Sequence, residues 1–142
     1  GREAEAREIW RDMLRLHDLV AKDKTERDAM TDTLEVLPHA LGEPELPVLV
    51  GTLADHGVIR SAHLVRRKLS HIPKPDQHMV VLAFWNGPDG RYERGHEEHR
   101  KEATQAVLKI FADTKHQFWV LPAEGFPLCA KAAKSIAGSQ LK

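Results

Sequence analysis

Histidines are the residues whose type and spacing come nearest to a chemical site in this chain. There are nine in 142 residues, and a histidine can bind a metal, carry a proton or lie on the surface. His96 and His99 are three residues apart, so a helix would place both on one face, within reach of one metal ion. His116 or His78 would have to supply a third ligand. The spacing is not that of the zincins, whose two histidines are four residues apart, and a polar, solvated helix start explains the same residues.

His63 and Cys129 are two further side chains with chemistry to consider. On a strand, His63 would share a face with Ile59 and Val65, where a buried base and a hydrogen-bonded core residue both fit. Cys129 falls near the start of an expected helix, whose dipole would lower the pKa of the thiol, although its alanine-rich surroundings favour a packed, inert thiol. No nucleophile stands at a readable spacing from a base. The sequence therefore favours a protein without catalytic residues and without a cofactor.

Arg66, Arg67 and Lys68 form a local cluster of cations. They could bind phosphate groups, but charges on a strand edge also block unwanted strand pairing, and no aromatic residues are interleaved to stack on bases. The whole chain has 21 Lys and Arg against 21 Asp and Glu, which argues against a broad basic surface for nucleic acid or anionic membrane. Nucleic-acid binding is therefore a secondary alternative.

Trp10, Met13 and Trp85 are the apolar candidates for binding a protein partner, and Arg66 and Arg67 are the charged ones. Partly exposed aromatic side chains often anchor interfaces, because they bury a large area while losing few rotamers. Packing into the core is the competing explanation for both tryptophans.

The elements that position these residues are organised around an apolar run at residues 79–85. Turn-forming residues close the run at 86–90, which predicts a strand covered on both faces by helices. Further strands are expected at 58–65 and 116–121, with helices from Leu46 to a cap at Gly57, at 96–113 and at 127–137. The first two strands would form a hairpin, and the helix at 96–113 would be a right-handed crossover to the third. We therefore predict an α/β (α+β) fold with a small three-stranded mixed sheet covered by helices.

Two helices are expected before this sheet. Residues 3–22 are strong helix formers, and Ile9, Met13, Leu16 and Val20 recur at helical spacing. Thr25 has the character of an N-cap, which predicts a second helix at 25–37. The Pro- and Gly-rich segment at 41–47 then suggests a boundary. We expect a helical arm at 1–41, packed on the domain or on a partner, and an α/β domain at 42–142.

Composition also bears on the compartment. A single cysteine excludes an internal disulfide and favours a reducing compartment. No apolar run approaches the roughly 20 residues that a membrane-spanning helix needs, and the first residues lack the apolar core of a signal peptide. We expect a cytoplasmic protein that does not insert into a membrane. Gly1 in place of Met suggests that the chain is a fragment of a longer protein.

Several segments of the second part share a pattern with a known family. They are a helix ending in Asp-His-Gly at 55–57, the strand at 58–64, the Pro-containing loop before 79–82, and the strand at 118–121 before a final helix. In this order, residues 47–142 resemble the C-terminal half of the SseB-like family, named for enhanced serine sensitivity. The Pro-Phe-Tyr type segment that closes the family pattern is replaced here by residues 125–129. The resemblance implies a domain without enzymatic chemistry.

These observations lead to one functional hypothesis and two alternatives. The hypothesis is a non-catalytic protein–protein interaction or regulatory domain, which binds a protein partner or associates with itself. The first alternative is a histidine-dependent metalloprotein or metal-dependent hydrolase using His96 and His99. The second is a nucleic-acid-binding module using Arg66, Arg67 and Lys68.

Overall fold

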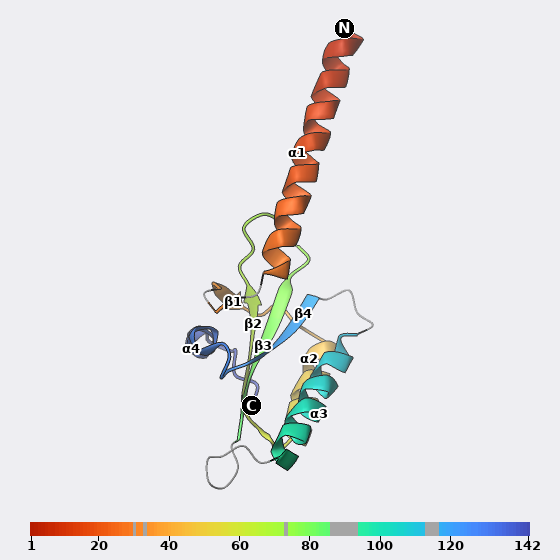
Figure 1. Ribbon diagram of the computed structural model, residues 1–142. Coiled ribbons are helices and arrows are strands. Elements are labelled where there is room, and N and C mark those ends of the chain that lie inside the picture. The colour runs from red at the N-terminus through yellow and green to blue at the C-terminus, as the bar shows by residue number, and fades with distance from the viewer. Residues whose placement is uncertain (30, 33, 73, 86–93, 113–116) are drawn as a thin grey trace. The chain divides into compact units, whose positions relative to one another are not determined.

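The computed structural model describes residues 1–29, 31, 32, 34–72, 74–85, 94–112 and 117–142, with only the backbone described for 94–96. The chain divides into two compact units, drawn with their elements labelled in Figure 1. The first consists of Gly1–Met30 and Leu69–Lys74, and the second of Thr31–Lys68 and Pro75–Lys142. Residues 31–41 therefore belong to the unit that contains the sheet.

The first unit is built on α1, a single helix that spans Arg2–Asp28. The predicted break at residues 23–24 and the second helix at 25–37 are wrong. Asp23 is held within the helix by an ion pair with Arg27, four residues later, at 2.9 Å. The hydroxyl of Thr25 donates to the carbonyl of Ala21 at 3.0 Å, as a helix-interior threonine does, and so does not act as an N-cap.

The second unit contains a four-stranded mixed sheet in the order β1-β2-β3-β4. The strands are β1 at Val36–Pro38, β2 at Ile59–Arg67, β3 at Gln77–Phe84 and β4 at Gln117–Pro122. The α+β class and the mixed sheet are confirmed, but the expected count of three strands is wrong. The additional strand, β1, is a short edge strand antiparallel to β2, and Pro38 is tolerated at its end because an edge strand has backbone positions that need no ladder hydrogen bond.

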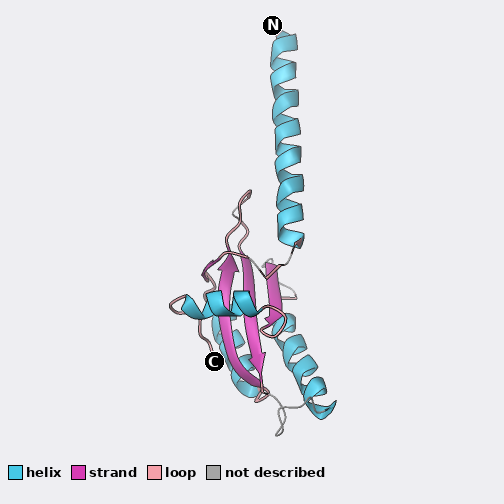
Figure 2. Ribbon diagram, turned by 60° about the vertical axis from the view of Figure 1, so that its left-hand side comes forward, coloured by secondary structure: helices cyan, strands magenta, loops and turns pink. Residues whose placement is uncertain are grey.

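The predicted connections between the three longer strands are confirmed. β2 and β3 are antiparallel, with Ala62 opposite Leu82. β3 and β4 are parallel, with Val80 opposite Val120, and α3 at Arg94–Ile110 is the crossover between them. The remaining helices are α2 at Glu45–Asp55 and α4 at Pro127–Ser135. In Figure 2, α4 crosses one face of the sheet while α2 and α3 lie behind the other.

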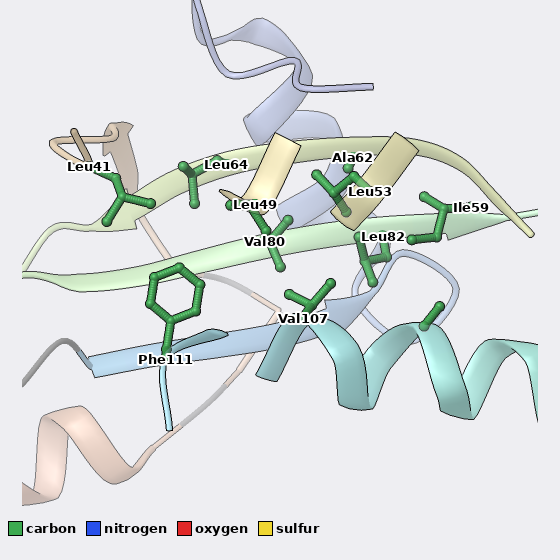
Figure 3. Packing of buried hydrophobic residues seen from close by; sticks show 11 residues of the cluster. Leu41, Leu49, Leu53, Ile59, Ala62, Leu64, Val80, Leu82, Val107 and Phe111 are labelled. Atoms are coloured by element: carbon green, nitrogen blue, oxygen red, sulfur yellow. The ribbon is translucent and has the colours of Figure 1, made fainter. Parts of the chain in front are cut away.

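β3 is buried on both faces, as the apolar run predicted. Because side chains alternate along a strand, Val80 and Leu82 point to one face while Met79 and Val81 point to the other. Figure 3 shows Val80 and Leu82 within the main core, together with residues of α2, α3 and β2. The aromatic rings of Phe111 and Phe118 stack with centroids 3.8 Å apart at one end of this core.

The end of the chain completes the edge of β2 that β1 leaves open. The N–H of Leu64 donates to the carbonyl of Ser139 at 2.7 Å, and the N–H of Leu141 donates to the carbonyl of Ala62 at 2.9 Å. The ammonium group of Lys142 donates to the carbonyls of Leu53 and His56 at the end of α2. These bonds satisfy carbonyl groups that a helix terminus leaves without partners.

Candidate interaction surface

The largest exposed apolar surface of the first unit lies on α1. Seven of its large apolar side chains are between 38% and 61% exposed: Ile9, Trp10, Met13, Leu14, Leu16, Leu19 and Val20. A helix that packed on the core of its own domain would bury such a stripe. Within the first unit, therefore, α1 is an amphipathic helix whose apolar side the described residues of its own unit do not cover.

The apolar residues of α1 have a regular arrangement. Ile9, Met13, Leu16 and Val20 are separated by four, three and four residues, which places them in one row along the helix. Trp10 flanks this row. We call the row formed by Ala6, Ile9, Met13, Leu16 and Val20 the α1 seam.

The last turn of α1 is different, because Ser70 and Ile72 of the same unit contact it. Arg27 is buried, and its guanidinium group contacts the carboxylate of Asp23 at 2.9 Å and donates to the carbonyl of Ile72 at 2.8 Å. The carboxylate of Glu26 accepts a hydrogen bond from the N–H of Ser70 at 2.8 Å. Arg27 comes seven residues after Val20, so it continues the row of the seam. The exposed seam therefore ends where this covered turn begins.

The predicted partner-binding residues fall in both units. Trp10 and Met13 lie exposed on α1. Trp85 lies in the second unit just after β3; it is also exposed, and the guanidinium group of Arg60 is 5.8 Å from the centre of its ring. A cation over an aromatic face contributes about 0.5–1 kcal/mol at an exposed site.

The cation cluster holds neighbouring strands of its own unit. The Nε of Arg66 donates to the carbonyl of Pro38 at 2.8 Å, and its Nη1 is 3.5 Å from the carboxylate of Asp76. Arg67 donates to the side chain of Gln77 at 3.3 Å. Lys68 forms an ion pair with Glu35 at 3.4 Å. These groups therefore have protein acceptors where a phosphate would otherwise bind.

The histidine pair lies on α3. His99 is exposed, whereas the side chain of His96 and the whole of His116 are outside the described residues. His78 is buried in β3, and its Nε2 accepts a hydrogen bond from the N–H of Ala40 at 3.1 Å. Among the described residues, no three His, Cys, Asp or Glu side chains gather closely enough to hold a metal ion. A site that uses His96 and His99 stays a prediction.

Cys129 is a packed thiol at the start of α4. Burial raises its pKa above the ordinary value, which disfavours the reactive thiolate. The carboxylate of Asp32 accepts hydrogen bonds from the N–H groups of Leu128, at 3.2 Å, and Cys129, at 3.0 Å. Asp32 therefore caps α4 from a distant part of the chain, a role that no local sequence pattern indicates.

Two shallow hollows flank the carboxyl ends of β3 and β4. One of about 580 Å³ lies beside α3, and its lining includes Phe84, Arg100 and Glu124. Arg100 is buried there, with its Nη2 3.6 Å from the carboxylate of Glu124 and its guanidinium group over the ring of Phe84. The other, of about 400 Å³, is lined in part by Arg60, Lys131 and Lys134. Neither lining of described residues contains His, Cys or Ser.

Comparison of the chain with models of protein families, with curated proteins and with solved structures found no match. Among the described residues, no helix combines the length and apolar character needed to cross a membrane.

Proposed function

We propose that this chain is a non-catalytic protein–protein interaction domain and that α1 is its binding element. The observation that supports the proposal is the seam on α1, which the described residues of its own unit leave exposed although it is formed by apolar side chains. The second unit, by contrast, encloses its own core between helices. The occupant of the seam should itself be an apolar helical face, because ridges of side chains on one helix fit the grooves of another.

The energetics favour a bound state. Full burial of a Leu or Met side chain contributes about 1.5–3 kcal/mol, and the seven exposed side chains of α1 retain a large part of that gain. Together they would supply a stabilisation of the same order as the roughly 5–15 kcal/mol that separates a small folded domain from its unfolded state. Most of the stability of a helix in a protein comes from the packing of its apolar face, so binding would also stabilise α1.

A photo-crosslinking amino acid on α1 tests the proposal in cells that make the protein. We expect adducts when it replaces Leu16 in the seam and far fewer when it replaces Arg11, which lies on the opposite side of the helix. The mass of the adduct identifies the class of partner. If neither position gives an adduct, α1 is not a binding element and the proposal fails.

The two alternatives rest on weaker support. A metal site needs His96 and His99 together with a third ligand, and stoichiometric metal lost on His99→Ala would support it. Nucleic-acid binding through Arg66 and Lys68 would need these groups to leave their present acceptors. The resemblance to the SseB-like family supports the main proposal only through the lack of enzymatic chemistry that it implies.

A further inference from the structure

We infer that the partner of the α1 seam is α1 of a second copy, and that the two helices pair in antiparallel orientation. This inference rests on the proposed function, because it requires that the seam be a binding surface. It adds the identity of the partner and the geometry of the pair.

The spacing of the seam is that of a two-helix coiled coil. Ala6, Ile9, Met13, Leu16 and Val20 follow one another at intervals of three, four, three and four residues. In a heptad these are the a and d positions, which insert between side chains of a facing helix. A seam of this kind is self-complementary when two copies meet across a two-fold axis, which is the commonest symmetry of soluble oligomers.

Residues at the C-terminal end of α1 disfavour a parallel pair. There the two copies of Arg27 would face each other across the interface, two like charges at the position that continues the seam. Moreover, Arg27 is already buried and donates to Ile72 in its own chain. Residues 70–72 of both copies would then have to lie between the two helices at the same level. An in-register parallel coiled coil would therefore have to break these contacts.

An antiparallel pair avoids this conflict. With Ile9 opposite the partner's Met13, Ala6 lies opposite the partner's Leu16 and Arg2 opposite the partner's Val20. The covered turn of each copy then lies outside the paired stretch at residues 2–20. A shift by one heptad would instead bring Ala6 against the partner's Asp23, within the covered turn. The register centred on Arg11 is the one that uses the seam and leaves residues 69–74 in place.

The residues on the two sides of the seam have opposite effects on the stability of the antiparallel dimer. On one side, the two copies of Trp10 lie beside each other near the two-fold axis, and Glu3 lies near the partner's His17. On the other side, the two copies of Asp12 approach and repel each other, and the exposed Arg15, 3.9 Å from Asp12 in the same helix, offsets little of this repulsion. In a parallel pair, Asp12 would instead lie next to the partner's His17. Replacing Asp12 therefore has opposite effects in the two orientations.

Sedimentation equilibrium of the full chain over a wide range of concentrations tests the inference. We expect reversible association to twice the 16.0 kDa of the monomer. Leu16→Gln should raise the dissociation constant by about tenfold or more, because the change occurs in both copies. Leu14→Gln is the matched control, since Leu14 is also exposed but lies off the seam. Asp12→Asn should tighten the dimer, and a weaker dimer with Asp12→Asn would overturn the antiparallel orientation.

Disulfide trapping in a Cys129→Ser background measures the orientation directly. An antiparallel pair joins an Arg2→Cys chain to a Val20→Cys chain, whereas two copies of residue 20 lie roughly 27 Å apart along the helix axis at 1.5 Å per residue. A disulfide between two Val20→Cys chains would overturn the antiparallel pair. A different result is a protein that stays monomeric at every concentration while crosslinking at residue 16 in cells gives adducts whose mass is not that of a dimer. That result would show that the partner is another protein and would contradict self-association, but it would agree with the proposed function. A monomer without any adduct would overturn both.

Discussion

β3 and α1 carry the same kind of side chains and have opposite surroundings. Met79, Val80 and Leu82 of β3 are fully buried, whereas Met13 and Leu16 of α1 are 57% and 61% exposed. β3 has a strand on each side and helices over both faces. The described residues of the first unit give the apolar side of α1 no comparable cover. Apolar character alone therefore indicates that a segment needs a neighbour, and the topology decides whether the same chain supplies one.

The secondary structure explains why only α1 can stay exposed. A helix makes its backbone hydrogen bonds within itself, so it can form before its apolar face is covered. A strand takes its hydrogen bonds from its neighbours, and β3 has β2 and β4 to provide them. An exposed apolar helix is thus compatible with a folded monomer, whereas an apolar strand such as β3 has to be central.

The largest effect is expected from Leu82→Ala in β3. Leu82 is fully buried in the main core, so its truncation leaves a cavity and should lower the free energy of unfolding by about 2–5 kcal/mol. Chemical denaturation followed by far-UV circular dichroism measures this loss. A loss below about 1 kcal/mol would be close to the effect of a surface substitution. It would mean that β3 is not the covered strand described here.

Arg27→Ala should be the next most damaging change, and it acts on the first unit. It leaves the largely buried carboxylate of Asp23 without its cation and the carbonyl of Ile72 without its donor, so we expect a loss of roughly 3 kcal/mol of local stability. Amide hydrogen exchange at the end of α1 and at Ser70 reports it. Exchange in β3 serves as the control and should not change, since β3 belongs to the other unit.

Asp32→Ala should remove the cap of α4 and destabilise the second unit by about 1 kcal/mol. The carboxylate accepts from the N–H groups of Leu128 and Cys129, and alanine offers no acceptor. Asp32→Asn keeps an oxygen in place and should retain most of the stability. Equal losses in both variants would show that the cap contributes little.

The elements that could be predicted from the sequence are those marked by a long local pattern. The apolar run of β3 and the periodic α3 are sufficient to predict the crossover to β4, whereas the turn predicted at 86–90 lies outside the described residues. β1 could not be predicted in this way, because its three residues acquire their structure by pairing with Arg67 and its neighbours in β2. The same applies to Asp32, whose role depends on α4, far along the chain.

The candidate surface could be predicted only in part. The spacing of Ile9, Met13, Leu16 and Val20 predicts an apolar helical face, and Trp10 was identified beside it. The sequence also predicts that this face packs on the domain or on a partner, but it does not predict that α1 continues to Asp28 or that β1 forms within the range of the helix expected at 25–37. Pairing with β2, far along the chain, thus overrides the helix that local propensity suggested for residues 36–38.

A smaller effect is expected from pH, through His63 on the side of β2 that faces α4. Burial, and then the positive charge of Lys134, lowers the pKa of His63 below its ordinary value of 6.5. Below pH 6.5 the unfolded chain therefore binds a proton that the folded chain does not, and stability should fall until the folded-state pKa is reached. Below that pKa both states are protonated and the loss stops. His63→Gln should flatten this part of the pH profile, and an unchanged profile would exclude His63 as its source.

Leu16→Ala should have the smallest effect on the monomer, and it tests the comparison most directly. The substitution matches Leu82→Ala in chemistry, but Leu16 is exposed and alanine is at least as good a helix former as leucine. At concentrations low enough to keep the protein monomeric, the free energy of unfolding should change by no more than about 0.5 kcal/mol. At high concentration the same variant should be less stable than the original chain, because binding to the folded state adds stability that depends on concentration. A loss of several kcal/mol in the dilute monomer would mean that α1 is already covered within its own chain, and the contrast with β3 would disappear.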